Sequence, residues 1–241
     1  MNDIAETDPS TLRSHVLSTV QNKGWYYNQD GVFSWSGSVK QIAQTLGVEP
    51  GRAQDAIENS FTPEALTQVT VAQDDKEIEV PLLQVLKENG YPMWIWTEGD
   101  EAWQRTKCEK TGVWQYVDKK NFSCAPKEKS DLLEKIVAEI IQKYGEGACV
   151  VVVDDKAANT EKSQQILGGI KGINAFNYHL KLNDLQADPT AFFNFLQNDV
   201  REAAKGKPII TVLDFDGVIA NTDGVLLGKA TDALTALMET K

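Results

Sequence analysis

The sequence predicts an α/β protein in which a parallel sheet carries helices on both faces, preceded by a small and mostly helical region. From about residue 80, apolar segments of strand length alternate with segments of helical periodicity. Segment 148–155, ACVVVVDD, is a continuous apolar run, as expected for a parallel strand covered on both faces. The first 75 residues lack this alternation. We therefore expect a separate region at 1–75 and a three-layer Rossmann-like core at 76–241.

The N-terminal region contains helical patterns and one hairpin signal. Asp30-Gly31 is a turn dipeptide between aromatic segments, which predicts a hairpin at 25–35. Apolar residues at helical spacing predict three helices, at 9–21, 38–48 and 51–60. Polar residues dominate 67–77, where we place the boundary with the core.

The core region reads as alternating helices and strands. The clearest helix is 129–145, because Leu132, Ile136 and Ile140 lie on one side of it. Another helix is expected to begin at Pro189 and to end at Gly206, just before the final strand. In chain order we expect helix 80–90, strand 91–97, helix 98–112, strand 113–117, helix 129–145, strand 148–155, strand 173–178, helix 189–206, strand 208–213 and helix 229–239.

Composition restricts the class of function. The 241 residues include 24 Lys and Arg against 35 Asp and Glu, a net charge of −11. This charge repels nucleic acid and anionic membranes at long range, so we expect neither as a partner. Three cysteines without metal-ligand spacing, and no signal peptide or long apolar stretch, favour the cytoplasm. With two histidines in the chain, any catalysis is expected to depend on carboxylates.

Polar side chains follow three of the predicted strands. Thr97 comes after WIW, Asp154 and Asp155 end VVVVDD, and Asp214 and Asp216 follow ITVL. In open α/β sheets the ligand site lies at the carboxyl ends of the strands, so these groups are expected to converge. Several carboxylates at one point require a hard cation such as Mg²⁺, and Mg²⁺ in turn indicates a phosphate-bearing substrate.

The Asp-x-Asp spacing suits phosphoryl transfer. Asp214 ends its strand and can face the phosphorus atom, whereas Asp216 can reach the leaving oxygen as a general acid. Gly217 permits a sharp backbone turn directly afterwards. An EF-hand calcium loop is disfavoured, since Val218 and Ile219 stand where that loop needs an oxygen ligand and a glycine.

These residues resemble the four motifs of the haloacid dehalogenase-like hydrolase superfamily. LDFDGV, residues 213–218, resembles the first motif, which implies that Asp214 is the nucleophile and Asp216 the acid and base. WIWT resembles the second, in which the hydroxyl of Thr97 holds the phosphoryl group. Glu98 and Gly99, which follow Thr97, are expected with it at the substrate.

The third and fourth motifs lie between these two. KSDLLEKI resembles the third and implies that Lys129, or alternatively Lys127, balances the charge of the intermediate. VVDDKAAN resembles the fourth and implies that Asp155 binds Mg²⁺, supported by Asp154 and Asn159. The resemblance also places Asp214 and the backbone carbonyl of Asp216 on the ion, and Gly217 beside the substrate.

The motif order departs from that of the family. The family begins with its nucleophile motif, whereas this chain runs Thr97, Lys129, Asp155 and then Asp214. A circular permutation that moves the nucleophile strand to the end of the chain explains this order, and such rearrangements are tolerated at exposed connections. Many members of the family carry a helical cap between the first two motifs, and joining the chain ends would place 1–75 in that position.

The resemblance, which covers about 78–235, implies a Mg²⁺-dependent phosphohydrolase that acts on a small phosphate monoester through an aspartyl-phosphate. A phosphomutase would use the same pair of aspartates and stays an alternative. Structural roles are also open: Thr97 could cap a helix, as could Asp154 and Asp155. Segment 37–61 resembles a helix-turn-helix, so a non-catalytic regulatory protein is the other alternative; Asp55 and Glu58 beside Arg52 disfavour DNA binding.

Overall fold

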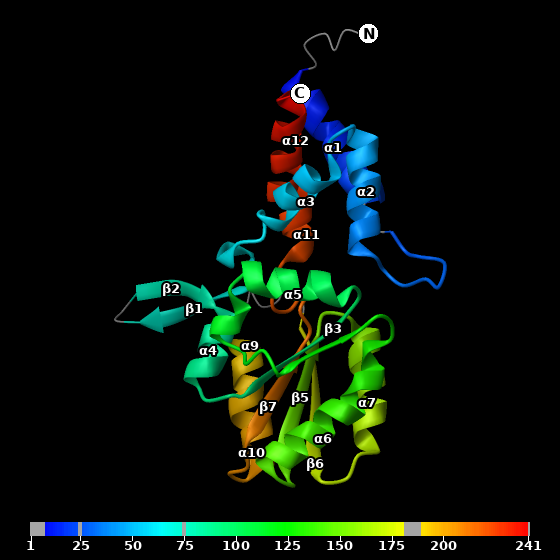
Figure 1. Ribbon diagram of the computed structural model, residues 1–241. Helices are drawn as coiled ribbons and strands as arrows, with labels where there is room; N and C mark the ends of the chain where they lie inside the picture. The colour runs from blue at the N-terminus through cyan, green and yellow to red at the C-terminus, as the bar shows by residue number, and fades with distance from the viewer. Residues whose placement is uncertain (1–7, 24–25, 74–75, 181–188, 241) are drawn as a thin grey trace.

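The computed structural model describes residues 8–23, 26–73, 76–180 and 189–240. Its main feature is a five-stranded sheet in which every pairing is parallel, with the order β4-β3-β7-β5-β6 (Figure 1). The strands are β3 (Met93–Glu98), β4 (Phe122–Ala125), β5 (Ala148–Asp154), β6 (Ile173–His179) and β7 (Ile209–Leu213). The predicted Rossmann-like α/β architecture is confirmed.

Helices cover both faces of this sheet, which explains the continuous apolar strands. In β5, Val151 and Val153 pack toward one face and Val150 and Val152 toward the other, and all four are fully buried. The first face is covered by α4 (Leu82–Glu88), α9 (Pro189–Asn194), η4 (Phe195–Val200) and α10 (Arg201–Ala204), and the second by α6 (Leu133–Tyr144) and α7 (Ala157–Gly168). Strands buried on both faces need no polar alternation.

The last strand of the chain occupies the centre of the sheet. β7 pairs with β3 on one side and with β5 on the other. From β3 the sheet continues to β4, and from β5 it continues in the opposite direction to β6. The direction of the strand order therefore reverses between β7 and β5, and in open α/β sheets such a reversal creates the ligand crevice.

A second body of helices packs beyond one end of the sheet (Figure 1). It consists of α1 (Pro9–Lys23), α2 (Trp35–Leu46), α3 (Pro50–Glu58), α11 (Thr222–Val225), η5 (Leu226–Ala230) and α12 (Thr231–Glu239). These helices share one apolar cluster, to which α5 (Glu101–Lys110) contributes Trp103. Arg13 of α1 forms an ion pair with Asp232 of α12 at 2.6 Å. The C-terminal helices, which we had assigned to the core region 76–241, thus pack with the N-terminal helices.

One local expectation was wrong. Segment 113–117, expected as a strand, begins with the 3-10 helix η2 (Val113–Gln115), and the strand forms later, at β4. Val113 and Val117 are both buried in the main core, as helical spacing allows. The polar segment 67–77, where we place the boundary, contains β1 (Gln68–Gln73), which pairs antiparallel with β2 (Lys76–Pro81). Residues 74 and 75 of that boundary lie outside the described residues.

The expected hairpin at 25–35 is reduced to a narrow loop closed by a single bridge between Tyr27 and Phe33. Gly31 has φ +67, which favours glycine at this turn. Two contacts attach the loop to the core: the backbone N–H of Trp35 donates to Asp100 Oδ2 at 3.1 Å, and Lys127 Nζ donates to the carbonyl of Asp30. Trp25, the first residue of the expected hairpin, lies outside the described residues.

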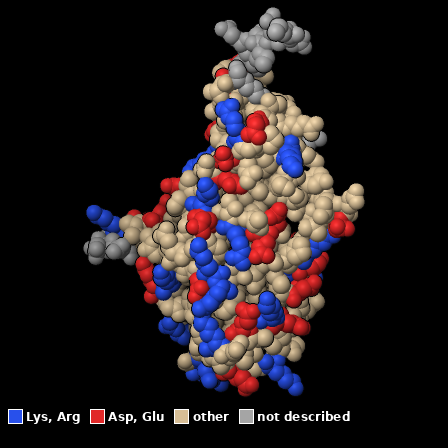
Figure 2. Space-filling view, viewed as in Figure 1, with Lys and Arg blue, Asp and Glu red and all other residues tan. Residues whose placement is uncertain are grey.

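The helix-turn-helix-like segment 37–61 forms part of the helical body. Its two helices, α2 and α3, meet at Gly47, and residues such as Ile42 and Ile57 bury their side chains in the shared cluster. Figure 2 shows acidic and basic side chains interspersed over the visible face of the molecule. Within the part of the chain that the structure describes, every helix is too short or too polar to cross a membrane.

The packing of α12 gives a stability prediction. Leu234 is fully buried in the helical cluster, so Leu234→Ala should lower the free energy of unfolding by about 2–5 kcal/mol. Leu227 is 38 % exposed on the same C-terminal segment, and Leu227→Ala should cost less than about 1 kcal/mol. Urea denaturation of both variants measures the difference. Equal losses would show that α12 does not contribute to a shared core.

Candidate active site

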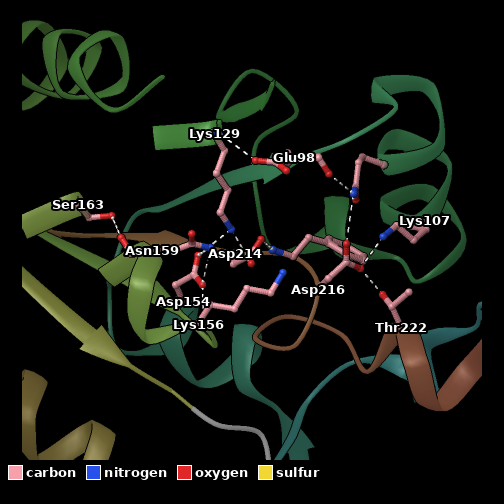
Figure 3. A network of polar contacts seen from close by, with 12 residues as sticks. Glu98, Lys107, Lys129, Asp154, Lys156, Asn159, Ser163, Asp214, Asp216 and Thr222 are labelled. Atoms are coloured by element: carbon pink, nitrogen blue, oxygen red, sulfur yellow. Dashed lines mark hydrogen bonds and ion pairs between the residues drawn. The ribbon is translucent and has the colours of Figure 1, made fainter. Parts of the chain in front are cut away.

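Three carboxylates meet at the carboxyl ends of β5 and β7. Val153 of β5 pairs with Leu213 of β7. Asp154 and Asp214, which directly follow these two residues, therefore lie side by side. Asp155 follows directly. Each of Asp154, Asp155 and Asp214 offers an oxygen atom, and these atoms all lie within 4.8 Å of one another. The strand ends at the reversal point of the sheet therefore bring together the acidic residues of two predicted motifs. Figure 3 shows two of them, Asp154 and Asp214, on either side of Lys129.

Lys129 lies between two of these carboxylates. Its Nζ atom is 2.7 Å from Asp154 Oδ2 and 2.5 Å from Asp214 Oδ2, and its side chain is 7 % exposed. The ammonium also lies 4.7 Å from the centre of the Trp96 ring. Lys129 begins η3 (Lys129–Leu132), whereas Lys127 reaches the hairpin loop instead. Of the two lysines left open by the sequence, Lys129 contacts the acidic cluster.

This crowding changes the ionisation of the cluster. Burial raises the pKa of Asp214 to about 7, and the charges of Asp154 and Asp216 act in the same direction, while Lys129 opposes them. Burial would lower the pKa of Lys129, but the adjacent Asp214 and Asp154 carboxylates outweigh it and raise the pKa. Burial, followed by the charge of Asp154, raises the pKa of Asp155. A cation near these groups would favour their ionised forms.

The three carboxylates differ in how fully they are hydrogen-bonded. Asp154 accepts from the backbone N–H of Lys156 at 2.8 Å and from Asn159 Nδ2 at 3.0 Å, in addition to Lys129. Asp155 Oδ1 is buried and has no hydrogen-bond partner among the described residues. Asp154 is thus held by the protein, in part through Asn159, whereas Asp155 Oδ1 has no such contact among the described residues.

Gly217 makes room for Asp155. Its φ of +82 lies in the left-handed region, and a Cβ atom on Gly217 would lie 2.5 Å from Asp155 Oδ2. A carbon and an oxygen atom that are not bonded to each other do not approach this closely, so a side chain at this position would force a shift. Glycine is therefore required here by backbone conformation and by the close approach of the carboxylate.

Asp216 faces the other way. Its Oδ1 atom accepts hydrogen bonds from Thr222 and from Lys107, whose Nζ is 2.5 Å away, and its Oδ2 accepts from Gln104 Nε2 at 3.2 Å. Burial would raise the pKa of Asp216, but the Lys107 ammonium and these hydrogen bonds outweigh it and lower the pKa. The Asp216 carboxylate lies outside the acidic cluster and beside the same cavity. The expected metal ligand at this residue was its backbone carbonyl, which these contacts do not test.

Sequence reasoning missed the residues that hold Asp216. Lys107 lies in α5 and is 1 % exposed, although a lysine within a charged helical segment is expected in solvent. Thr222 begins α11, and Gln104 lies one helical turn before Lys107. These three residues do not form a recognisable sequence motif with Asp216. Their contacts depend on how α5 packs over the end of β7, which the sequence does not reveal.

The residues that follow β3 have separate roles. Thr97 is buried at the carboxyl end of the strand, beside the cavity. Glu98 Oε2 accepts a hydrogen bond from the backbone N–H of Lys129 at 3.2 Å, so it positions the lysine. Gly99 has φ +125 and also lines the cavity. The alternative that Thr97 caps the next helix is wrong, because Asp100 is the N-cap of α5 and accepts from the backbone N–H of Trp103 at 3.1 Å.

A cavity of about 480 Å³ opens over these groups. Its lining includes Thr97, Lys129, Asp155, Asp214 and Asp216 from the core. The hairpin loop of the N-terminal region contributes Tyr27, Gly31 and Phe33. A small ligand in this cavity would therefore contact the acidic cluster and the N-terminal region at the same time.

No family model, curated protein or solved structure matches this chain. Its chemistry is therefore inferred from the arrangement of its own residues.

The close approach at Gly217 gives a second prediction. Gly217→Ala forces either the backbone or Asp155 to move, and should lower the free energy of unfolding by about 1–3 kcal/mol. Gly228→Ala is the matched control, since a Cβ there meets nothing within 4 Å, and should leave stability unchanged or slightly raised. Thermal or urea unfolding distinguishes the two. Full stability of Gly217→Ala would contradict the close approach.

The raised pKa of Asp214 gives a third prediction. With a pKa of about 7 in the folded protein against 3.8 ordinarily, Asp214 binds its proton more tightly when folded. Its contribution to stability is present below about pH 4 and is lost as the pH rises through about 7. In metal-free buffer, the stability of wild type should therefore fall relative to Asp214→Asn between about pH 5 and pH 8. A difference that stays constant over this range, measured by urea denaturation, would contradict the raised pKa.

Proposed function

We propose that this protein is a Mg²⁺-dependent phosphohydrolase that acts on a small phosphate monoester through an aspartyl-phosphate. The observation that carries the proposal is the meeting of Asp154, Asp155 and Asp214 within 4.8 Å around buried Lys129. Asp216 lies two residues after Asp214, beside the same cavity. A nucleophile, a compensating cation and a separate carboxylate base are the groups that this chemistry needs.

The residues fit a magnesium ion. All three cluster members offer oxygen ligands, which Mg²⁺ prefers, and Asp155 Oδ1 is buried without a partner among the described residues. Asp155 and Asp214 would hold the ion, with Asp154 beside them, and the family resemblance adds the backbone carbonyl of Asp216. When bound, the ion would neutralise part of the charge on the phosphoryl group and permit an anionic nucleophile to approach.

Asp214 would attack the phosphorus atom, and two contacts orient its carboxylate. Its Oδ1 atom accepts a hydrogen bond from the backbone N–H of Phe215 at 2.8 Å, and Oδ2 contacts Lys129. In the first step a carboxylate oxygen of Asp214 forms a bond to phosphorus while the bond from phosphorus to the ester oxygen breaks. Lys129, with the hydroxyl of Thr97, would stabilise the phosphoryl oxygens. The departing ester oxygen takes a proton from solvent water to become the alcohol, and solvent regains a proton from Asp216 after the second step.

Asp216 would act in the second step. Its lowered pKa makes it a base at neutral pH, able to accept a proton from the water molecule that cleaves the aspartyl-phosphate. The products are then phosphate and a regenerated Asp214 carboxylate. The family mechanism also has Asp216 protonate the leaving oxygen. However, the three groups that donate hydrogen bonds to Asp216 disfavour the protonated form of its carboxyl group.

The sheet order supports a circularly permuted member of the haloacid dehalogenase-like hydrolases. If β7 is counted as the first strand, the order becomes 3-2-1-4-5, which is the usual doubly wound order. The start of α1 and the end of α12 lie at the same end of the molecule, and the two helices pack together (Figure 1). Joining the chain ends would therefore require little change. The helical body and its hairpin loop would then be the cap over the site.

The test is turnover of 4-nitrophenyl phosphate with and without Mg²⁺. Wild type should hydrolyse it only with the metal, and Asp214→Asn should lose at least about 10³-fold in kcat because the nucleophile is gone. Lys129→Met should lose about 10²-fold or more because the phosphoryl charge is no longer balanced. Lys127→Met is the matched control and should stay within about threefold, since Lys127 binds the hairpin loop.

A second measurement identifies the intermediate. Acid quenching during turnover of a radiolabelled phosphate ester should leave label on wild type but none on Asp214→Asn. Asp216→Asn should retain more label than wild type because its water-activating base is missing. If wild type and Asp214→Asn are equally inert with Mg²⁺ and Mn²⁺, the hydrolase proposal fails and a regulatory role gains.

A further inference from the structure

The helical body contains a second cavity, of about 200 Å³. Helices from both ends of the chain line it, together with α5. The side chains that form its apolar wall are Val20, Trp35, Ile42, Ile57, Trp103, Leu226 and Ala230, each at most 9 % exposed. Gln21, Asp223 and Leu227, which are more exposed, also line it. An apolar cavity of this kind accepts an apolar ligand more readily than water.

The second cavity adjoins the acidic one. Trp103 and Asp223 line both cavities. The Trp103 ring stacks on Trp35 with centroids 3.8 Å apart and an angle of 9°, and Phe61 packs edge-on against it at 5.2 Å. Packing on two sides fixes the position of Trp103. A group that passes Trp103 from the acidic cavity would therefore meet a rigid apolar surface.

We propose that the two cavities form one substrate site, in which the alcohol part of the phosphate ester carries an uncharged apolar group that occupies the second cavity. The inference rests on the proposed phosphohydrolase function. An apolar cavity of about 150 Å³ holds benzene, so the second cavity suits a phenyl ring or a branched chain of about five carbons. The phosphoryl group would lie at Asp214 and the apolar group among Trp35, Ile57 and Ala230.

Charge also selects the substrate. The described residues that line the second cavity include no lysine or arginine, and Asp223 lies where the two cavities adjoin. A carboxylate or a second phosphate on the alcohol part would be repelled by Asp223 and would lose hydration in the apolar cavity. The site therefore favours amphiphilic monoesters over sugar bisphosphates or nucleoside diphosphates.

The first experiment compares two esters with similar leaving groups. Hydrophobic burial of a phenyl ring should raise kcat/KM for 2-phenylethyl phosphate about 10- to 100-fold above that for ethyl phosphate. Ala230→Leu adds three carbons inside the second cavity and should abolish most of this preference. Ala236→Leu adds the same carbons at an exposed position of α12 and should keep the preference.

The second experiment measures binding without catalysis. Because Trp35 and Trp103 line the cavity, 2-phenylethanol should produce a saturable change in tryptophan fluorescence with wild type and Ala236→Leu but not with Ala230→Leu. If no phosphatase activity exists, this change would still support the cavity as a ligand site while the hydrolase proposal fails. Equal turnover of the two esters by wild type, or no saturable change, would overturn the inference, even if Ala230→Leu does not fold.

Discussion

The candidate site depends on how the charges of three neighbouring carboxylates are compensated, because the sheet brings these mutually repelling groups together. Asp154 and Asp214 emerge from adjacent buried strands, and Asp155 follows within the same small space. Such a cluster is unfavourable unless positive charge compensates it. Lys129 supplies one charge from η3, and Glu98 holds the backbone of that lysine in place. The loops after β3, β4, β5 and β7 are thereby coupled through a single set of charges.

The second carboxylate of the Asp-x-Asp pair belongs to a separate electrostatic unit. Lys107 compensates Asp216 as Lys129 compensates Asp214, and each lysine is almost fully buried. This division lets two acidic residues, separated by one phenylalanine, take different protonation states in one cavity. The two lysines would let a strongly acidic protein accept the proposed anionic ligand, since the local field at the site differs from that expected from the net charge.

Much of the architecture could be predicted from the sequence because it depends on local patterns. The apolar run of β5 and the helical periodicity of α6 are visible in single segments. Strand β4 was misplaced because Val113 and Val117 suit a buried helical turn as well as a strand, and β1 was missed although Val69 and Val71 alternate with polar residues. The acidic cluster could be predicted because strand ends converge in any parallel sheet. The buried Lys107 and the docking of α12 could not, since both depend on packing between distant segments.

The central position of β7 has a consequence for how the sheet is assembled. Strands β3 and β5 do not pair with each other, because β7 lies between them and follows both of them along the chain. A chain in which β7 has not yet paired would leave one edge of β3 and one edge of β5 unpaired, and unpaired strand edges favour association with other chains. Pairing of β7 with both strands closes this gap and brings Asp214 beside Asp154 in the same event. The sheet and the acidic cluster therefore form together.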